Sequence, residues 1–244
     1  MRRPAFDHTL PISRRRNRSG KHISPNETGY SVIQEASAST IPLSRPPAAI
    51  KRIFDVVFAS VALLALTPLL LSLMAAIWCD SPGNPIFVQE RIGVNGRRFR
   101  LFKLRTMVPN AEAALGRLAH LNEVQSPLFK VRRDPRVTHL GRFLRVTSLD
   151  ELPQLMNVIR GDMSLVGPRP PLIDEVSQYT VEQARRLTVT PGLTGLWQVS
   201  GRSNRSFDEL VALDLYYIDH WSFWLDLELI AKTLWVVVTC RGAY

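Results

Sequence analysis

Cysteine is scarce in this sequence of 244 residues. It occurs at Cys79 and Cys240, and neither belongs to a CxxC pair or to a cluster with histidine. Two cysteines cannot form the disulfide framework that stabilises small secreted domains, and a structural zinc ion requires four ligands at characteristic spacings. The five histidines also lack metal-ligand spacing. The composition therefore excludes a small disulfide-stapled module and gives no indication of structural zinc.

The common nucleotide-binding signatures are missing as well. The chain has no GxxxxGK[ST] loop and no GxGxxG sequence, so neither a P-loop kinase nor a Rossmann dehydrogenase is expected. Acidic residues are in deficit: 21 Asp and Glu against 31 Lys and Arg give a formal charge of +10. This excess predicts an anionic partner, such as a phosphorylated substrate or anionic lipid. Nucleic acid is not expected, because no recognised motif supports the charge.

Residues 1–49 have little apolar periodicity. They contain eight basic and three acidic side chains among many Ser, Thr and Pro residues. Such a segment cannot bury enough apolar surface to offset the entropy lost on ordering. No apolar run follows its arginines at signal-peptide distance. We therefore predict a disordered basic tail that contacts anionic lipid.

The next segment, 50–80, is predicted to be a membrane-inserted helix. Its 24 residues from Val56 to Cys79 carry no charge, and a straight helix of that length spans about 36 Å, more than the ~30 Å hydrocarbon core. Thr67-Pro68 divides the run into halves of 12 residues, and the proline predicts a kink. Both flanks are basic, which favours placing both on the cytoplasmic side. The residues alone leave a crossing helix and a re-entrant helix equally open.

Residues 81–244 read as a cytoplasmic domain of α+β class, mostly helical. Two strands, Ile86 to Ile92 and Arg98 to Met107, flank Asn95-Gly96, a strong hairpin signal. Helical patterns occupy 109–124, 138–145, 149–160, 171–186, 206–219 and 223–239. The last contains charged residues among tryptophans, which is typical of an amphipathic helix that lies at a membrane interface.

The adjacent carboxylates Asp150 and Glu151 are the strongest candidates for chemistry. Ser148 precedes Glu151 by three residues, so the segment also fits a capping box at a helix start. The surrounding cations favour a catalytic interpretation. Adjacent carboxylates beside cations suit a divalent metal and a phosphoryl group, with one acid binding Mg²⁺ and the other acting as nucleophile or base. Arg142 and Arg145 precede the pair, Arg160 follows it, and Lys103 and Arg105 are expected within reach of it.

Two loops rich in proline and glycine add candidate phosphate ligands. The first, 161–170, carries Arg169, whose forked guanidinium suits bidentate contact with phosphate. The second, 191–202, offers Gln198 as an amide and Arg202 as another fork. Each loop alone is commonplace in proteins, whereas both beside a carboxylate pair indicate a substrate site.

Five segments occur in a characteristic order. They are Lys51-Arg52-Ile53-Phe54-Asp55, Phe102-Lys103-Leu104-Arg105-Thr106-Met107, Leu149-Asp150-Glu151-Leu152-Pro153-Gln154-Leu155, Val166-Gly167-Pro168-Arg169-Pro170, and Pro191-Gly192-Leu193-Thr194-Gly195-Leu196-Trp197-Gln198-Val199-Ser200-Gly201-Arg202. In that order they resemble the bacterial sugar transferase family, the monotopic phosphoglycosyl transferases, over residues 50–244. The ending Arg241-Gly242-Ala243-Tyr244 is most similar to the undecaprenyl-phosphate galactose phosphotransferases of exopolysaccharide synthesis.

The resemblance implies a reaction and a location. A UDP-sugar and undecaprenyl phosphate would give a lipid-diphosphate sugar and UMP, with Mg²⁺, at the cytoplasmic face of the bacterial inner membrane. It assigns Asp150 as nucleophile and metal-associated residue and Glu151 as its essential partner, and it favours the re-entrant helix. Arg145, Arg169 and Arg202 match basic positions of the family. The family usually has Ser before the kink proline, where this chain has Thr67.

A different class of function is a non-catalytic membrane scaffold that recruits polysaccharide assembly partners. The carboxylate pair among cations argues against it, because a scaffold does not need that arrangement. A homo-oligomer is compatible with the sequence, and the resemblance favours UDP-galactose or UDP-glucose as the donor.

Overall fold

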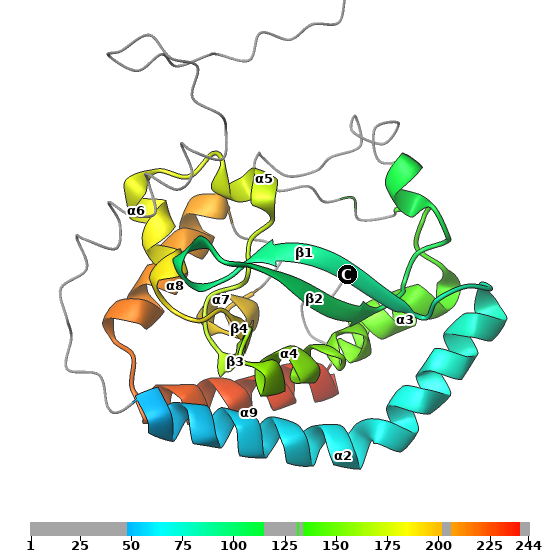
Figure 1. Cartoon of the computed structure of the whole chain (residues 1–244), viewed down its shortest axis with the longest axis horizontal. Coiled ribbons are helices and arrows are strands. Elements are labelled where there is room, and N and C mark those ends of the chain that lie inside the picture. Colours follow the sequence, from blue (N-terminus) through cyan, green and yellow to red (C-terminus); the bar gives the residue numbers. More distant parts are fainter. Residues whose placement is uncertain (1–47, 115–130, 132–133, 202–205, 240–244) are drawn as a thin grey trace, which may run out of the picture.

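The computed structural model describes residues 48–114, 131, 134–201 and 206–239. Residues 1–47 of the predicted tail, and Arg202, lie outside these ranges. The described elements form a mostly helical structure of α+β class with one long apolar helix near the N-terminus (Figure 1). In chain order they are α2 (Ala48–Asp80), β1 (Ile86–Ile92), η1 (Val94–Gly96), β2 (Arg98–Leu104), η2 (Ala111–Ala114), α3 (His139–Val146), η4 (Leu149–Glu151), α4 (Gln154–Arg160), β3 (Ser164–Val166), α5 (Ile173–Val176), α6 (Val181–Ala184), η5 (Arg185–Thr188), β4 (Gly192–Thr194), α7 (Leu196–Val199), α8 (Phe207–Asp219) and α9 (Phe223–Thr239).

The predicted hairpin is confirmed. Strands β1 and β2 pair antiparallel in a register that runs from Ile86 opposite Leu104 to Ile92 opposite Arg98. Asn95 and Gly96 reverse the chain with φ angles of 52° and 78°, the left-handed conformation that these two residue types tolerate best. In the first half of β2, exposed Arg98 and Arg100 alternate with buried Phe99 and Leu101, whereas the last three residues, Phe102, Lys103 and Leu104, are half-buried or buried.

Two long helical patterns are interrupted. The pattern predicted over 149–160 becomes the 3₁₀ turn η4 and then helix α4, with Pro153 at the junction. Proline lacks the N–H that a continuous helix would need there. The pattern over 171–186 divides into α5, α6 and η5, because Thr180 forms a capping box with Gln183 and starts a new helix. Helices α3, α8 and α9 lie within one residue of their predicted positions.

A second sheet was not predicted. Strands β3 and β4 pair in parallel, with Ser164 opposite Gly192 and Val166 opposite Thr194. The backbones approach so closely that a Cβ on Gly192 would lie 2.0 Å from the Gly167 nitrogen. Each strand has three residues, too few for the alternation that identifies a strand in a sequence.

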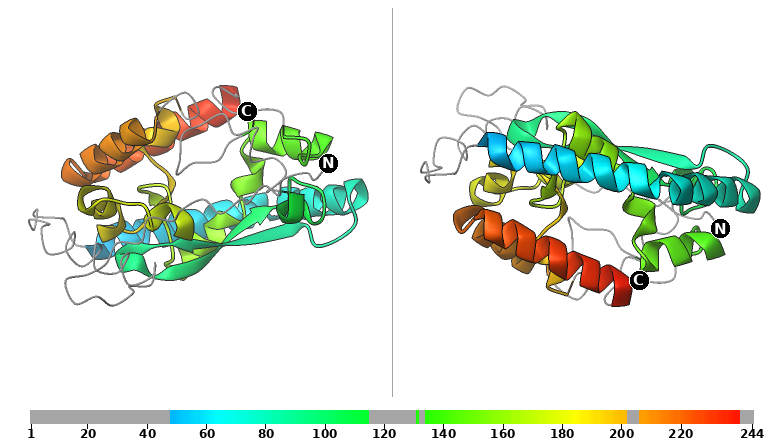
Figure 2. Two further views of the ribbon diagram at one scale, coloured as in Figure 1. Left: turned by 90° about the horizontal axis from the view of Figure 1, so that it is seen from above. Right: turned by 90° about the horizontal axis from the view of Figure 1, so that it is seen from below.

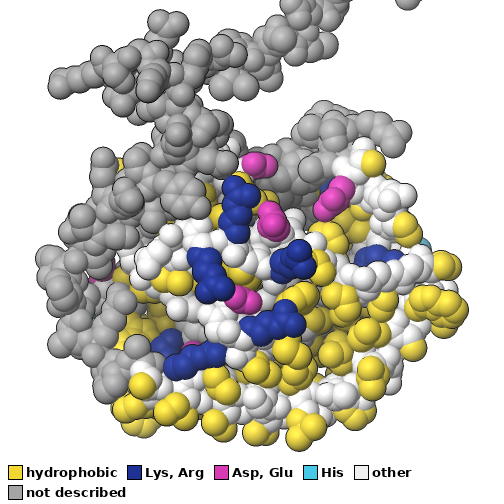
Figure 3. Space-filling model, in the orientation of Figure 1, with side chains coloured by type: hydrophobic (Ala, Val, Ile, Leu, Met, Phe, Trp, Pro, Cys, Tyr) yellow, Lys and Arg dark blue, Asp and Glu magenta, His cyan; other side chains and the backbone are white. Residues whose placement is uncertain are grey.

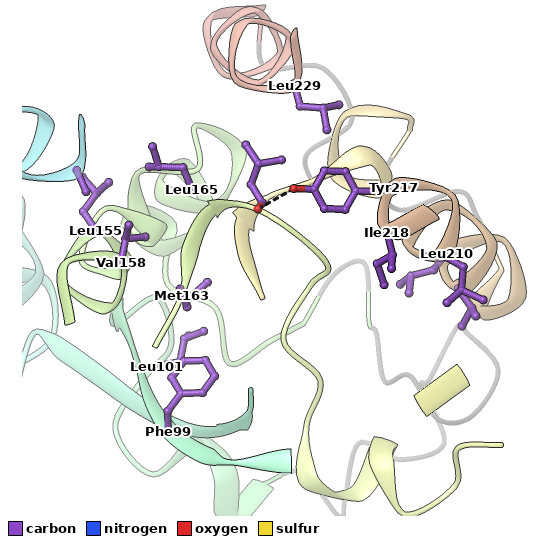
Figure 4. Close-up of a cluster of buried hydrophobic side chains, with 14 residues drawn as sticks. Phe99, Leu101, Leu155, Val158, Met163, Leu165, Leu210, Tyr217, Ile218 and Leu229 are labelled. Atoms are coloured by element: carbon purple, nitrogen blue, oxygen red, sulfur yellow. Dashed lines mark hydrogen bonds between the residues drawn. The ribbon is translucent and has the colours of Figure 1, made fainter. Parts of the chain in front are cut away.

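The main core joins this small sheet to the hairpin and to α4, α8 and α9. Figure 4 shows Phe99 and Leu101 of β2 beside Met163, with Leu155 and Val158 of α4 nearby. On the other side of β3, Tyr217 donates its hydroxyl hydrogen to the Val166 carbonyl at 3.1 Å. The core therefore fixes α4, which follows the carboxylate pair, against β2, which carries Lys103.

Helix α2 rests on the domain at both of its ends. Near the N-terminus, Lys51 pairs with Asp226 of α9 at 2.5 Å, and Arg52 donates to the Val158 and Ile159 carbonyls of α4 at 2.6 and 2.8 Å. Near the C-terminus, side chains of α2 pack against β2 and α3. Figure 2 shows α2 and α9 on the same face of the molecule.

The outer face of α2 is apolar and exposed. By length and composition this helix could cross a membrane, and 11% of its most apolar window is buried within the protein. It continues through Pro68, and its ribbon changes direction toward the C-terminal end in Figure 1. Thr67 donates to the Leu63 carbonyl at 2.7 Å, the bond expected when threonine replaces serine before the proline.

Candidate active site

The carboxylate pair lies on η4, a single 3₁₀ turn between α3 and α4. Asp150 is buried, with 8% of its surface exposed, and Glu151 is half-buried. The turn follows Ser148, which has a left-handed backbone with φ 57°. This conformation is uncommon for serine, and strained backbones concentrate at functional sites.

The capping box expected at Ser148 does not form. Within the described residues, the Ser148 hydroxyl makes no capping hydrogen bond to a backbone N–H of the turn. An N-cap residue normally has an extended backbone, which directs its side chain to those N–H groups, whereas the backbone of Ser148 is left-handed. Glu151 instead accepts a hydrogen bond from the Lys103 ammonium at 2.7 Å. The carboxylates are therefore arranged around a cation rather than around a helix start.

Two of the predicted cations meet the pair. Lys103 reaches Glu151 from β2, and its charge also lowers the pKa of Asp150. Arg145, from the last turn of α3, donates through Nε to the Thr106 hydroxyl at 2.9 Å and acts on Asp150 in the same direction. Strand β2 and helix α3 thus deliver one cation each to the two sides of η4.

Burial dominates the ionisation of Asp150. It raises the pKa of this carboxyl to about 6, and the negative charge of Glu151 adds to the increase, while Lys103 and Arg145 oppose it. A carboxyl with such a pKa is largely ionised at neutral pH and is poorly solvated. Both properties suit a nucleophile that attacks phosphorus.

Two other predicted ligands, Arg105 and Gln198, contact segments other than the carboxylate pair. Arg105 donates to the Ser81 carbonyl and packs over Gly83, so its contacts are with the turn after α2. Gln198 lies half-buried on α7, with its amide oxygen beside Gly195. Arg202 is outside the described residues.

Arg169 follows β3 in a segment with proline on both sides. Its guanidinium pairs with Glu175 of α5 at 3.2 Å, and about a quarter of the side chain is exposed. The positive charge of Arg169 lowers the pKa of the buried Arg91, and the negative charge of Glu151 raises it. Arg91 therefore lies within electrostatic range of both Arg169 and Glu151.

Arg91 is the residue of this site that sequence reasoning missed. Its guanidinium is buried and donates to the Pro170 carbonyl at 3.1 Å. Burial lowers its pKa to about 9, and the adjacent Arg169 adds to the decrease. A signal was present: Arg91 pairs with Phe99, whose side chain faces the core, so the hairpin register places the arginine inside.

Charge and hydrophobicity separate on the surface. Figure 3 shows basic side chains gathered over the middle of the face that the β1–β2 hairpin occupies, with hydrophobic side chains along the edge formed by α2. On α9 the exposed apolar side chains include Trp224, Leu234 and Trp235. An apolar edge next to basic residues fits a surface that meets anionic lipid.

Comparison with known proteins matches most of this chain to one family. Residues 47–240 match the family described as Bacterial sugar transferase. The match includes the apolar helix, the hairpin, the carboxylate pair and the Arg169 segment.

Several curated proteins are similar over about four fifths of the chain. The galactosyl transferase CpsE of Streptococcus agalactiae is 47% identical over 194 residues, which are 79% of this chain and 43% of that protein. The exopolysaccharide production protein ExoY of Rhizobium meliloti is 44% identical over 80% of this chain and 88% of its own length. An undecaprenyl-phosphate galactose phosphotransferase of Salmonella typhimurium is 42% identical over 80% of this chain and 42% of its own. The matched part thus spans less than half of two of these relatives.

Proposed function

Since the chain belongs to the bacterial sugar transferase family, we propose that it transfers a hexose-1-phosphate from a UDP-sugar to undecaprenyl phosphate and releases UMP. UDP-galactose and UDP-glucose are the favoured donors, and the reaction is the first membrane step of exopolysaccharide synthesis. The relatives named for galactosyl transfer and exopolysaccharide production support this function. The observation that carries it is the buried carboxylate of Asp150, whose neighbour Glu151 pairs with Lys103 at 2.7 Å and whose pKa is lowered by the charges of Lys103 and Arg145.

The reaction proceeds through two displacements at the same phosphorus atom. Asp150 attacks the donor's β-phosphorus, the bond to the UMP oxygen breaks, and UMP leaves with that electron pair. The phosphosugar is then an acyl phosphate on Asp150. An oxygen of the lipid phosphate attacks next and restores the free carboxylate. Lys103, Arg145 and Arg169 offset the charge of the diphosphate, which otherwise repels the nucleophile.

Glu151 acts through Lys103. The ion pair at 2.7 Å fixes the ammonium beside Asp150 and keeps it from turning to solvent. The negative charge of Glu151 also raises the pKa of Asp150 and so strengthens it as a nucleophile once it is ionised. This role accounts for two adjacent carboxylates of which one is buried and one paired.

The carboxylate pair also fits a magnesium ion. Mg²⁺ binds through one or two carboxylates and completes its shell with water and substrate phosphates. Among the residues that the structure describes, no three of the His, Cys, Asp and Glu side chains converge as a protein-only cage would require. Asp150 is the residue that would hold the ion, which when bound would neutralise charge on the donor diphosphate.

We place the enzyme at the cytoplasmic face of the inner membrane, with α2 entering and leaving on that face. Lys51 and Arg52 tie the start of α2 to α9 and α4, and side chains near its end pack on β2 and α3. A helix held to one domain at both ends cannot cross a bilayer without separating from it. Anionic lipid is the expected surface partner.

The test supplies the donor without the lipid acceptor. Protein in membranes is incubated with UDP-galactose or UDP-glucose labelled in the sugar, and protein-bound label and released UMP are measured. We expect both in equal amount, and both lost in Asp150→Asn. Release of UMP only after acceptor is added would exclude the covalent intermediate. No UMP from any UDP-hexose with both substrates present would favour the non-catalytic scaffold.

A further inference from the structure

The segment 168–171, which carries Arg169, accepts hydrogen bonds from other parts of the protein at four successive carbonyl groups. Three of its four residues are proline, which has no N–H and a fixed φ angle, so the segment cannot form a helix or a strand interior of its own. Its conformation is therefore set by the groups that donate to it. These bonds are Gly192 N to Pro168 O (2.9 Å), Arg186 Nη2 to Arg169 O (3.3 Å), Arg91 Nη1 to Pro170 O (3.1 Å) and Ile92 N to Pro171 O (3.1 Å).

One of these donors belongs to a buried ion pair. Arg186 on η5 has 2% of its surface exposed and Asp214 on α8 has 1%. The guanidinium donates through Nε to Asp214 at 2.8 Å and through Nη1 to the Tyr179 hydroxyl at 2.6 Å. Its third nitrogen, Nη2, lies 2.7 Å from the same Asp214 carboxylate oxygen and also donates to the Arg169 carbonyl at 3.3 Å. Three fixed acceptors thus orient one guanidinium completely.

A second buried charge holds the side chain of Arg169. Glu175 on α5 is 2% exposed, and its carboxylate accepts from Nη1 of Arg169 at 3.2 and 3.4 Å. The carboxylate lies inside the protein, whereas the guanidinium is partly open to solvent. Arg169 is therefore fixed at two points: its backbone by Arg186 and its side chain by Glu175.

Stability alone does not explain this arrangement. Buried ion pairs can often be replaced by apolar residues of similar volume with no loss of stability, because desolvation offsets their attraction. A network of four buried charged groups around one partly exposed arginine is instead typical of a site that needs a side chain in one geometry. The four groups are Arg91, Glu175, Arg186 and Asp214.

We propose that Glu175 and the Arg186–Asp214 pair are positioning residues, which fix the side chain and the backbone of Arg169 for contact with the diphosphate of the sugar donor. The inference rests on the proposed function. Glu175 and Asp214 act only through Arg169 and touch no substrate. Their removal should weaken donor binding and leave acceptor binding unchanged.

The test is a double-mutant cycle between Glu175→Gln and Arg169→Ala in the full chain in membranes. Gln keeps the shape of Glu and removes its charge. We expect Glu175→Gln to raise the KM for the UDP-sugar about tenfold, the loss of one charge-assisted hydrogen bond, with the acceptor KM unchanged. In the Arg169→Ala background the same substitution should change the donor KM less than twofold. Effects that multiply in the double variant, or that fall equally on both substrates, would overturn the proposal.

A matched pair of variants tests the backbone contact. Arg185 and Asp219 join the same two elements, η5 and α8, by an ion pair of 2.6 Å that is partly exposed. Asp214→Asn should raise the donor KM, whereas Asp219→Asn should leave it unchanged. Equal effects of the two would count against the proposal. The Glu175 cycle decides the matter alone if Asp214→Asn does not fold.

Measurements on the wild-type chain distinguish failure of the proposed function from failure of the positioning role. A wild type that releases UMP from a UDP-hexose, together with multiplying effects in the cycle, overturns the positioning role and leaves the proposed function standing. A wild type that releases none overturns the proposed function and this inference with it.

Discussion

Asp150 combines two properties that oppose each other in most carboxyl groups. It is buried, which raises its pKa to about 6, and it is surrounded by enough positive charge to ionise at neutral pH. The first property weakens the solvation of the nucleophile and the second keeps it charged. The pKa of Asp150 depends on its burial on η4 and on the charges of Lys103 and Arg145, so a change in any of these neighbours should alter the ionisation of the nucleophile.

The pH dependence of turnover should report this pKa. Only the ionised carboxylate can attack, so kcat/KM should fall below pH 6, by about tenfold per pH unit. Lys103 lowers the pKa of Asp150, and Lys103→Met should therefore move the acidic limb to higher pH. The measurement is a pH–rate profile of both proteins between pH 5 and about 8. A limb at the same pH in both would show that Asp150 is not the titrating group.

Asp150→Asn should be inactive and yet more stable. The folded protein holds this pKa above the ordinary value of 3.8, so ionisation of Asp150 lowers the free energy of unfolding as the pH rises from about 4 to 6. A neutral amide avoids that loss, which is up to about 3 kcal/mol at pH 7.5. Thermal unfolding should show a gain at pH 7.5 that largely disappears at low pH. The exposed Asp174→Asn is the control, with no gain at either pH.

The sequence predicted the carboxylate pair because its members are neighbours, and local spacing is visible in a sequence. It misplaced the role of Ser148, since a left-handed backbone angle has no signature in residue type there. It missed Arg91 because the group that defines its role, the Pro170 carbonyl, lies 79 positions away. Contacts of that separation follow from packing, which a single sequence does not display.

At the scale of elements, a helix or strand can be predicted from the sequence when its own residues carry a strong local pattern. The hairpin carries strand alternation and an Asn-Gly turn, and its structure agrees. Strands β3 and β4 come from segments 28 positions apart, since Ser164 lies opposite Gly192. Their pairing depends on glycines that let the two backbones approach closely, and no local sequence pattern predicts it. Helix α2 was recognised from its uncharged run, whereas its contacts with α4 and α9 come from tertiary structure.

The two ends of α2 should be accessible from the same side of the membrane. The check is labelling of single cysteines at Ala49→Cys and Arg97→Cys, both exposed, with Cys79 and Cys240 replaced by serine. An impermeant reagent should reach both from the cytoplasmic side. Pro68→Ala removes the kink residue and should shift part of the population to labelling from opposite sides. Opposite labelling in the parent protein would show that α2 crosses.

At the scale of the whole molecule, we propose that membrane attachment is divided between an apolar edge and basic charge. The apolar edge is supplied by α2 and by Trp224 and Trp235 of α9. The basic charge comes partly from residues 1–45, which hold eight of the 31 Lys and Arg residues. The two contributions differ physically, since apolar insertion is insensitive to salt and the attraction of basic residues to anionic lipid is not.

Deletion of residues 1–45 should leave turnover unchanged and weaken binding to anionic vesicles. The segment contains no predicted catalytic motif, and each basic residue near the surface contributes about 1 kcal/mol at most. Vesicle cosedimentation at low and high salt measures the binding, with vesicles of neutral lipid as the control. A truncated protein that binds membranes but has lost its turnover would reveal a catalytic role for the tail.

The bond between Lys51 and Asp226 has a consequence for biosynthesis. The two residues are 175 positions apart, and a ribosome that adds about 5–20 residues per second needs roughly 9–35 s to pass from one to the other. During that interval the long apolar helix α2 has left the ribosome while its partner on α9 does not yet exist. We therefore expect α2 to enter the lipid during translation, and the cytoplasmic domain to fold afterwards onto a helix already in the bilayer.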